Sequence, residues 1–266
     1  MADLATNLLA TGSGGVVGLV LGLVGGGGSI LAVPLLVYLV GVNPPHVAIG
    51  TSALAVSGSA FANLLAHARL GNVKWRCAAV FAAAGVAGAL LGAEFAKALD
   101  GHKLLLLFGL LMVVVGLVMF RNQGGTGDAN IRLTADTARE LLPLLLGIGF
   151  AVGVLSGFFG IGGGFLIVPG LMLATGMPLK FAIGTSLVAV GAFGAATAAS
   201  YAASGLIDWR IAVLFILGGV GGGVIGIALG RSLAARKRAL TLVFATTVVA
   251  VGLYVLARGV VTLGSA

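Results

Sequence analysis

The sequence predicts an all-α polytopic membrane protein made of two inverted repeats, and three observations lead to this fold class. Charged residues make up 8% of the 266 residues and apolar residues 59%, whereas a soluble domain usually carries about 25% charged residues. No Asp, Glu, Lys or Arg occurs between Asp3 and Arg69, a stretch far longer than the roughly 20 residues that one crossing needs. The third observation is an internal duplication.

The duplication joins the two halves of the chain at a spacing of about 135 residues, with four landmarks in the same order. In each half a glycine run interrupts an apolar segment, which is typical of transporters built from repeats with broken helices. The landmarks and their second copies are Gly25–Pro34 and Gly160–Pro169, Ile49–Ser52 and Ile183–Ser186, Gly71–Arg76 and Gly205–Arg210, and the glycines Gly85, Gly88 and Gly92 with Gly219, Gly222 and Gly226.

Each half divides into four apolar segments, which gives eight in total. The first segment of each half contains the glycine run and covers residues 13–40 or 144–175. The polar stretch 121–142 links the first repeat, residues 1–120, to the second, residues 143–266, and is expected in the cytoplasm. The remaining predicted spans, by pairs of equivalent segments, are 46–68 and 180–203, 74–96 and 210–230, and 103–120 and 239–257.

The basic residues favour inverted halves. One basic cluster, Arg69 to Arg76, follows the second segment of the first half, whereas the other, Arg231 to Arg238, follows the third segment of the second half. Both clusters can lie in the cytoplasm, where Lys and Arg accumulate, only if each half crosses an odd number of times. The simplest solution makes each glycine-broken segment a re-entrant hairpin with arms of about a dozen residues, too short to span alone. We therefore expect six full crossings and two hairpins, with both termini outside.

The glycine runs predict an anion site. A backbone break inside a bilayer is costly unless its N–H and C=O groups are buried in protein or face water, and consecutive glycines permit a tight reversal with positive φ. The helix that begins near Ser29 or Gly164 is expected to aim its unpaired N–H donors and its positive dipole end into the interior. Two such ends facing each other form an anion site near the midplane. The alternative is that the glycines only permit close helix packing.

Hydroxyl and amide side chains extend this candidate site. Each Thr-Ser pair opens an apolar helix, where its hydroxyls could donate to an anion or could cap or back-bond within the helix. Asn63 shares a helical face with Ser59 and His67, and such a stripe faces the bundle interior or a water path, or serves as packing glue between helices. The candidate substrate-binding residues are Gly25, Gly26, Gly27, Gly28, Ser29, Thr51, Ser52, Asn63, Gly160, Gly162, Gly163, Gly164, Thr185 and Ser186.

Other functions find little support in the sequence. H-E-x-x-H, P-loop and acidic metal-binding motifs are missing, so we predict no catalytic residue, metal or cofactor and do not expect an enzyme. The net charge of +8 comes from basic residues in short connections, which argues against nucleic acid as a partner. Glu94 and Lys97 are expected to form a surface pair, and the two Trp-Arg pairs, Trp75-Arg76 and Trp209-Arg210, to be interfacial anchors.

The duplicated glycine element, the Ile-Gly-Thr-Ser pairs and the Trp-Arg loops resemble those of the TauE/SafE family, also called the 4-toluene sulfonite uptake permeases. The resemblance covers nearly the whole chain. It implies a multi-pass secondary transporter of the bacterial inner membrane that carries small sulfur-containing anions such as sulfite, sulfoacetate and related organosulfonates, often outward. A passive anion channel and a membrane-embedded enzyme subunit are the alternatives.

The resemblance carries over to the two glycine runs, to Pro34 and Pro169, and to the two Thr-Ser pairs. The first copy departs from the second, with Gly26 where the second has Ile161 and Ser29 where the second has Gly164. The two breaks are therefore not expected to contact substrate in the same way.

The spaced glycines also bear on the partners of the chain. Glycine faces at Gly85, Gly88 and Gly92 and at 218–226 allow closer helix approach than one small bundle requires. This predicts a homodimer, with the small anion and the lipid bilayer as the other partners.

Overall fold

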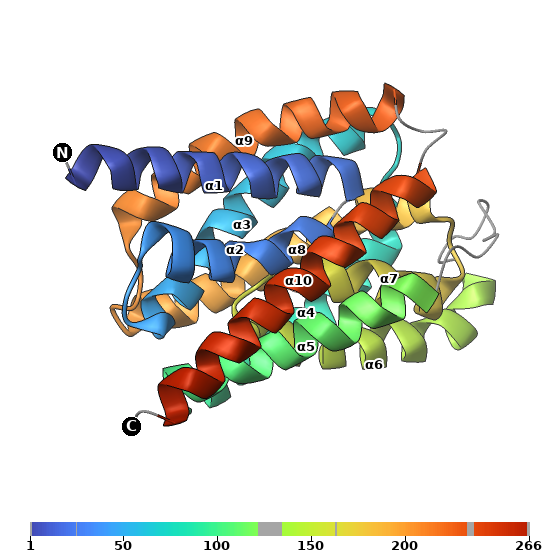
Figure 1. The fold of residues 1–266 in the computed structure, drawn as a ribbon. Helices are drawn as coiled ribbons and strands as arrows, with labels where there is room; N and C mark the ends of the chain where they lie inside the picture. The colour runs from blue at the N-terminus through green and yellow to red at the C-terminus, as the bar shows by residue number, and fades with distance from the viewer. Residues whose placement is uncertain (1, 25, 122–134, 163, 233–236, 265–266) are drawn as a thin grey trace.

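The chain folds into a bundle of long, nearly aligned helices (Figure 1). The computed structural model describes residues 2–24, 26–121, 135–162, 164–232 and 237–264, and across these ranges it contains helices and no strands. Eight helices are long and apolar enough to cross a membrane, which confirms the all-α polytopic class. They are α1 (Ala2–Val24), α3 (Pro45–Arg69), α4 (Trp75–Lys97), α5 (Gly101–Arg121), α6 (Ala135–Phe159), α8 (Leu179–Ala203), α9 (Trp209–Ser232) and α10 (Lys237–Gly264).

Each half also contains one short helical arm after its glycine run. In the first half the arm consists of a 3-10 turn, η1 (Gly26–Leu31), a short α-helix, α2 (Ala32–Pro34), and a π-helix, η2 (Leu35–Val40). In the second half it is a single helix, α7 (Gly164–Thr175). Pro34 and Pro169 lie inside these arms, where a proline removes one backbone donor.

The first arm of each hairpin is longer than the sequence predicts. We expected about a dozen residues, but α1 has 23 residues and α6 has 25, and both are candidate spans on their own. The prediction started each segment too late, because residues 2–12 and 135–143 continue the same helix. Residues 135–142, which we expected in the linker, accordingly belong to α6. Only the second arm, 27–40 or 164–175, is too short to span.

The two halves interlock rather than pack as separate bodies. The first helix of each half lies along the third helix of the other half, so that α1 packs on α9 and α6 packs on α4. The equivalent helices α3 and α8 cross at the centre, where the Ser57 hydroxyl donates to the carbonyl of the equivalent residue Gly191 at 2.8 Å. The start of α3, at Gly50, lies against Tyr201 at the end of α8. The two central helices therefore run antiparallel, and so do the equivalent helices α5 and α10, which join Gly109 to Gly252 and Gly259 to Leu106.

Spaced glycines hold the two long-helix pairs together. A Cβ added to Gly85, Gly88 or Gly92 on α4 would meet Phe193 or the backbone of α6. On α9, the glycines Gly218, Gly222 and Gly226 approach the backbone of α1 in the same manner. These glycine faces are used inside one chain, as close helix packing requires. They therefore do not support the predicted homodimer. The homodimer stays a prediction that the structure of one chain does not test.

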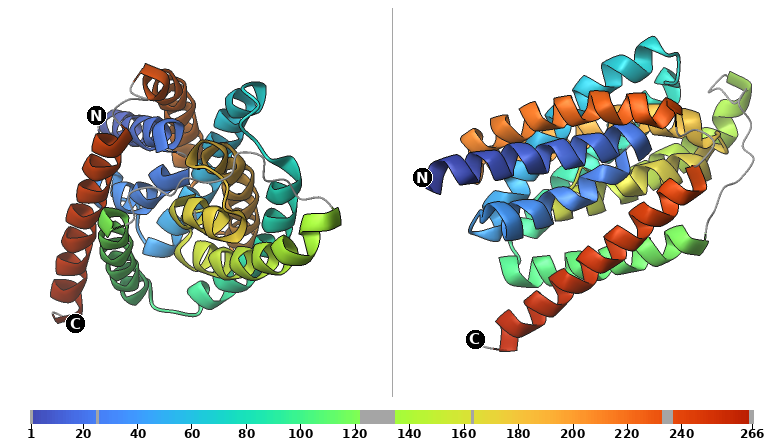
Figure 2. Two further views of the ribbon diagram at one scale, coloured as in Figure 1. Left: turned by 90° about the vertical axis from the view of Figure 1, so that its right-hand side faces the viewer. Right: turned by 45° about the horizontal axis from the view of Figure 1, so that its top comes forward.

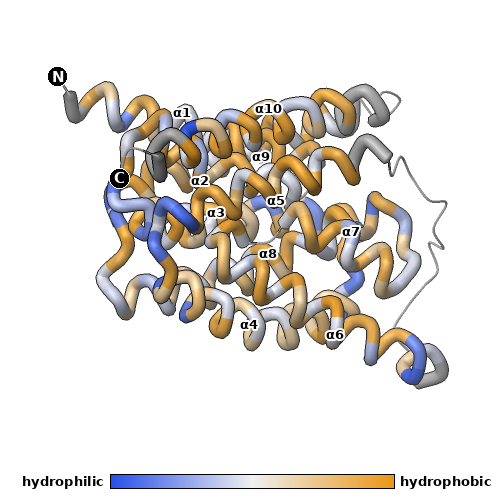
Figure 3. The backbone as a smooth tube through the Cα atoms, turned by 60° about the horizontal axis from the view of Figure 1, so that its bottom comes forward, coloured by the Kyte–Doolittle hydropathy of each residue, from blue (hydrophilic) through white to orange (hydrophobic). Residues whose placement is uncertain are grey.

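The bundle has two ends of different charge. Both termini lie at one end (Figure 1). We call it the neutral end because it holds four acidic and four basic residues among those that the structure describes: Asp3, Glu94, Asp100 and Asp208, with Lys97, Lys103, Arg210 and Arg258. The opposite end, the basic end, holds among the described residues only two acidic residues, Asp136 and Glu140. Its basic residues are Arg69, Lys74, Arg76, Arg121, Arg139, Lys180, Arg231, Lys237 and Arg238. Hydrophilic residues gather at the helix ends while the helix bodies are mostly apolar (Figure 3).

The pair α5 and α10 lies at one edge of the bundle (Figure 2). The two helices pack chiefly on each other. They reach the central part of the molecule through a few aromatic contacts, which join Phe108 to Phe159 at 5.6 Å and Tyr254 to Tyr38 at 5.4 Å between ring centroids. Phe159 directly precedes the second glycine run, so this edge pair rests against the break.

Candidate functional site

The two glycine breaks meet in the middle of the molecule. The 3-10 turn η1 of the first half packs against α7 of the second half and also against α1 and α8. Ser29, Ile30 and Ile161 are fully buried there. The helical arms that start at this point thus begin inside the protein, as the sequence predicts for the anion site.

The second break is a sharp turn. Gly160 and Gly162 have φ values of +65° and +61°, in the left-handed region that glycine enters without steric cost. A Cβ on Gly160 would overlap the Ile49 side chain, and one on Gly162 would lie 3.1 Å from Val56. The helix α7 begins two residues later at Gly164. Its first N–H groups have no partner within the helix and carry the positive end of its dipole.

The first break has a different backbone. Residues Gly26–Leu31 form a continuous 3-10 turn, and none of the described glycines Gly26, Gly27 and Gly28 has a positive φ. Gly28 lies so close to α1 that a Cβ would be 2.7 Å from the Leu21 nitrogen and from the Val17 oxygen. The predicted site residues Gly25 and Gly163 lie outside the described residues.

The two threonines of the Ile-Gly-Thr-Ser motifs hold loops of the opposite half. The Thr51 hydroxyl oxygen accepts a hydrogen bond from the backbone N–H of Asp208 at 2.9 Å. The Thr185 oxygen accepts in the same way from the N–H of Lys74 at 3.0 Å. Both threonines are fully buried. Neighbouring Gly50 and Gly184 allow the backbone of Leu206 and of Asn72 to come close.

The serines of the same motifs are also engaged. Ser52 Oγ lies 2.8 Å from the carbonyl of Ile49 and 2.9 Å from the carbonyl of Gly160 in the second break. A serine hydroxyl has one proton to donate, and these carbonyls share it, so Ser52 has no proton for an anion in this arrangement. Ser186 Oγ donates to the carbonyl of Ile183 at 2.8 Å. We call these contacts of the two motifs the cross-repeat clasp.

Asn63 lies away from the two breaks. It is buried on α3, its amide donates to the carbonyl of Ser59 at 2.8 Å, and its side chain fills the space that Gly223 leaves on α9. Ser59 fills the corresponding space over Gly219. The structure therefore brings Ser52 to the second glycine run and holds Thr51 and Thr185 against loops of the opposite half. It leaves Asn63 in the interface between α3 and α9.

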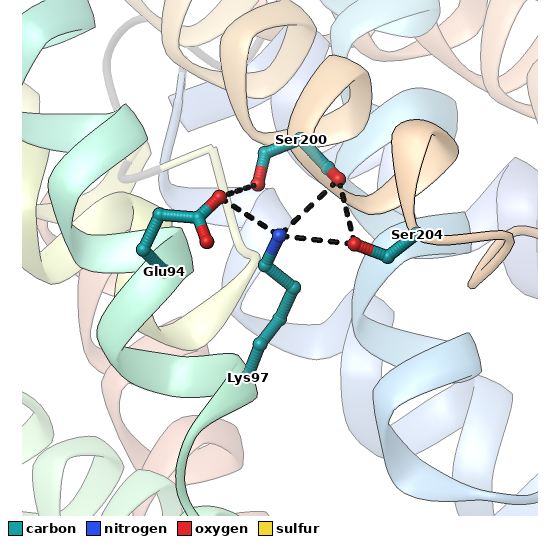
Figure 4. A network of polar contacts seen from close by, with 4 residues as sticks. All are labelled: Glu94, Lys97, Ser200 and Ser204. Carbon is teal, nitrogen blue, oxygen red and sulfur yellow. Dashed lines mark hydrogen bonds and ion pairs between the residues drawn. The ribbon is translucent and has the colours of Figure 1, made fainter.

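A polar network at the neutral end extends the predicted surface pair. Lys97 Nζ lies 2.8 Å from Glu94 Oε1, which confirms the pair. Lys97 also donates to Ser204 Oγ at 3.0 Å, and the Ser200 hydroxyl donates to Glu94 at 2.8 Å, so the network joins α4 to α8 (Figure 4). The residues of the first repeat that are equivalent to Ser200 and Ser204 are Ala66 and Leu70, so the two serines have no hydroxyl counterpart there.

Two buried hydroxyls on α8 were not among the predicted site residues. Thr197 Oγ1 and Tyr201 Oη are buried without a hydrogen-bond partner in the part of the chain that the structure describes. The signal in the sequence is their spacing of four residues, which places both on one helical face. Within the same ranges, no group of three His, Cys, Asp or Glu residues is placed to hold a metal ion.

Comparison with known proteins identifies a transporter family and relatives that are named as membrane transporters. The family model described as "Sulfite exporter TauE/SafE" matches residues 10–255. A "Probable membrane transporter protein" of Xylella fastidiosa (strain 9a5c) is 51% identical over 251 residues, which cover 94% of this chain and 95% of that protein. The "Probable membrane transporter protein YunE" of Bacillus subtilis (strain 168) is 28% identical over 266 residues, covering 92% and 97% of the two chains. No solved structure matches the chain.

Proposed function

The chain belongs to the TauE/SafE family of membrane transporters, and we propose that it is a secondary carrier that exports small sulfur-containing anions. The substrate class is that of sulfite, sulfoacetate and related organosulfonates. The proposal places the anion between the two glycine breaks, near the middle of the membrane.

One observation carries this proposal, namely that the breaks of both halves meet in the buried centre of the molecule. A helix that starts inside the protein directs unpaired N–H groups and a partial positive charge at that point. Anions bind at such helix starts, and broken helices at a repeat interface form substrate sites in other transporters. The donors we propose are the backbone N–H groups of the glycines in both runs, because no side chain screens them.

We propose two roles for the cross-repeat clasp, which are to fix the shape of the second break and to contact the moving anion. Ser52 fixes the carbonyl of Gly160, and a carbonyl held by a hydroxyl turns its negative end away from an anion. Thr51 and Thr185 each accept one hydrogen bond and keep one proton, which a hydroxyl can donate. We propose that these protons reach the anion when it moves from the centre toward either end.

The charge of the two ends supports an orientation. Lys and Arg accumulate on the cytoplasmic side of membrane proteins, which supports an orientation with the basic end inside and both termini outside. The halves are then inverted relative to each other, in agreement with the antiparallel packing of α3 with α8 and of α5 with α10. In such carriers one repeat or helix bundle moves against another around a fixed site, and we propose alternating access between the two ends by a motion of this kind.

The test is flux through purified protein in liposomes. A carrier loaded with sulfoacetate or sulfite on one side should saturate, and labelled anion should enter faster when unlabelled anion is present on the other side. Gly162→Ala should lower anion binding roughly 10-fold or more, because strain at a positive φ and a blocked donor act together. Gly221→Ala, where no atom lies within 4 Å of an added Cβ, is the matched control. Flux that never saturates would identify a channel, and a folded Gly162→Ala protein with normal flux would remove the glycine runs from the site.

A further inference from the structure

The two threonine contacts of the cross-repeat clasp hold residues of opposite charge at equivalent positions. Thr185 binds the backbone of Lys74 at the basic end, and Thr51 binds the backbone of Asp208 at the neutral end. Lys74 and Asp208 are the same residue of the Gly-x-x-x-Trp-Arg loop in the two repeats. Each directly precedes a long helix, α4 or α9, so the same backbone geometry presents an ammonium group at one end and a carboxylate at the other.

Asp208 caps its helix, whereas the Lys74 ammonium lies over the Phe181 ring. Asp208 Oδ1 accepts the N–H of Ile211 at 3.0 Å, which caps the first turn of α9 as Asp does at many helix starts. Lys74 makes no side-chain cap for α4, and a cation at a helix N-terminus opposes the helix dipole. A residue that breaks a local rule in this way is expected at a functional position.

A second lysine lies beside Lys74. The Nζ atoms of Lys74 and Lys180 lie 4.4 Å and 5.9 Å from the centroid of the same ring, Phe181. Lys180 and Phe181 belong to the first turn of α8, little more than one turn before Thr185. At the equivalent positions of the neutral end the chain has His46 and Val47. Two ammonium groups thus lie close to the Thr185 contact, whereas the equivalent positions near Thr51 carry no lysine.

We propose that Lys74, Lys180 and the start of α8 form an anion-collecting mouth at the basic end, and that Asp208 makes the opposite mouth repel anions. This inference rests on the proposed function for its biological meaning. Charged walls at an opening concentrate counter-ions and raise their association rate. The carrier then takes up anions readily from the basic end and releases them at the neutral end without rebinding. The asymmetry sets the KM values at the two faces, while the anion gradient sets the net direction.

The chain supplies its own probes for this charge difference. Its two tryptophans, Trp75 and Trp209, directly follow Lys74 and Asp208 and are similarly exposed, at 56% and 61%. Trp209→Phe leaves Trp75 as the single fluorophore, and Trp75→Phe leaves Trp209. Each protein in phosphatidylcholine nanodiscs is titrated with iodide, caesium and neutral acrylamide, which separates charge from accessibility.

The expected result is stronger iodide quenching of Trp75 than of Trp209, relative to acrylamide, and the reverse for caesium. Lys74→Asp should lower the iodide quenching of Trp75 to about the level of Trp209, and should melt no lower than the parent protein because Asp is a better helix cap. The hydrogen bond to Thr185 is kept because the backbone N–H of residue 74 donates it. Lys103→Gln, which removes one exposed charge at the neutral end, should leave Trp75 unchanged. Equal iodide quenching of the two tryptophans, or no response to Lys74→Asp, would overturn the proposal.

Transport gives the second readout. In oriented liposomes, Lys74→Asp or Lys180→Gln should raise the KM for sulfite or sulfoacetate entering from the basic end by about tenfold, the low end of electrostatic focusing, with the maximal rate little changed. Asp208→Asn should lower the KM at the neutral end. If the parent protein carries no sulfur anion but shows the quenching difference, the proposed function fails and the anion-collecting mouth stands. Unchanged KM values in an active carrier would overturn the anion-collecting mouth and leave the proposed function in place.

Discussion

The two halves of the molecule share their scaffold and differ at their glycine breaks. In the first half the chain continues through a 3-10 turn and ends its short arm as a π-helix, whereas the second half makes a turn with two left-handed glycines and then a regular α-helix. The sequences differ at the same place, with Gly26 and Ser29 against Ile161 and Gly164. A repeat protein can therefore keep one packing pattern and still build an asymmetric centre.

The scaffold is held by backbone contact between pairs of long helices. Gly18 and its equivalent Gly153 both lie against the backbone of a partner glycine, Gly219 or Gly85. No larger residue fits such a contact without moving a helix. The breaks are short and connect to one helix on each side, so they can change their turn without moving the long helices.

The largest effect is expected where the second break is most constrained. Gly160→Ala combines a left-handed backbone, which costs about 1–2 kcal/mol for a residue with a Cβ, with overlap on Ile49, which adds roughly 1–3 kcal/mol. Gly205→Ala has a similar φ of +70° but open space around it, so it should show the backbone cost alone. Thermal unfolding of the two purified variants measures the difference. If both melt alike, Ile49 does not constrain the break.

The next effect tests the shared scaffold. Gly18→Ala and Gly153→Ala should each lower the free energy of unfolding by roughly 1–3 kcal/mol, and by similar amounts, because both added methyl groups meet backbone of a facing helix. Gly12→Ala and Gly147→Ala are the matched controls, since no atom lies within 4 Å and alanine favours a helix by about 1 kcal/mol. Unfolding in a denaturing detergent gives the values. A large difference between Gly18→Ala and Gly153→Ala would show that the two interfaces are not equivalent.

The smallest effect concerns the two clasps. Thr51→Val and Thr185→Val each remove the acceptor of one backbone N–H, which is worth about 1 kcal/mol, and the two losses should be equal. Thr246→Val is the control, because the Thr246 hydroxyl is exposed and bonds within its own helix. Hydrogen exchange at residues 74 and 208 should speed up selectively in the matching variant. Unchanged exchange there would mean that the loops hold their position without the threonines.

Much of the fold follows from the sequence because its signals are local and repeated. Apolar length alone predicts the spans, and the spacing of the landmarks predicts the two halves. The length of the first hairpin arm was wrong because the break, at Gly25, was taken as the middle of a segment rather than the end of a long helix. Leu4, Leu8 and Leu9 extend α1 toward the terminus, and Thr6 and Asn7 do not interrupt the helix.

The site was less predictable, because its contacts join residues far apart in the sequence. The pairing of Thr51 with Asp208 spans 157 positions, and nothing in either motif indicates the other. The sequence does predict that glycines and hydroxyls gather together. It cannot tell that Thr51 accepts rather than donates, or that the glycine faces of α4 and α9 are filled by α6 and α1. Those outcomes depend on which surfaces meet after all helices are in place.

The interlocked pairing has a consequence for how the protein is made. Helix α1 enters the membrane early in synthesis, but its packing partner α9 is translated only after about 180 further residues have been added. Until then its glycine face, with Gly14, Gly18 and Gly22, has only lipid or a chaperone to contact. Helices that insert first and associate later can wait in this way. Shortening the chain before residue 209 should therefore leave α1 without its partner, and the membrane quality-control proteases should remove such a fragment even though every one of its helices inserts.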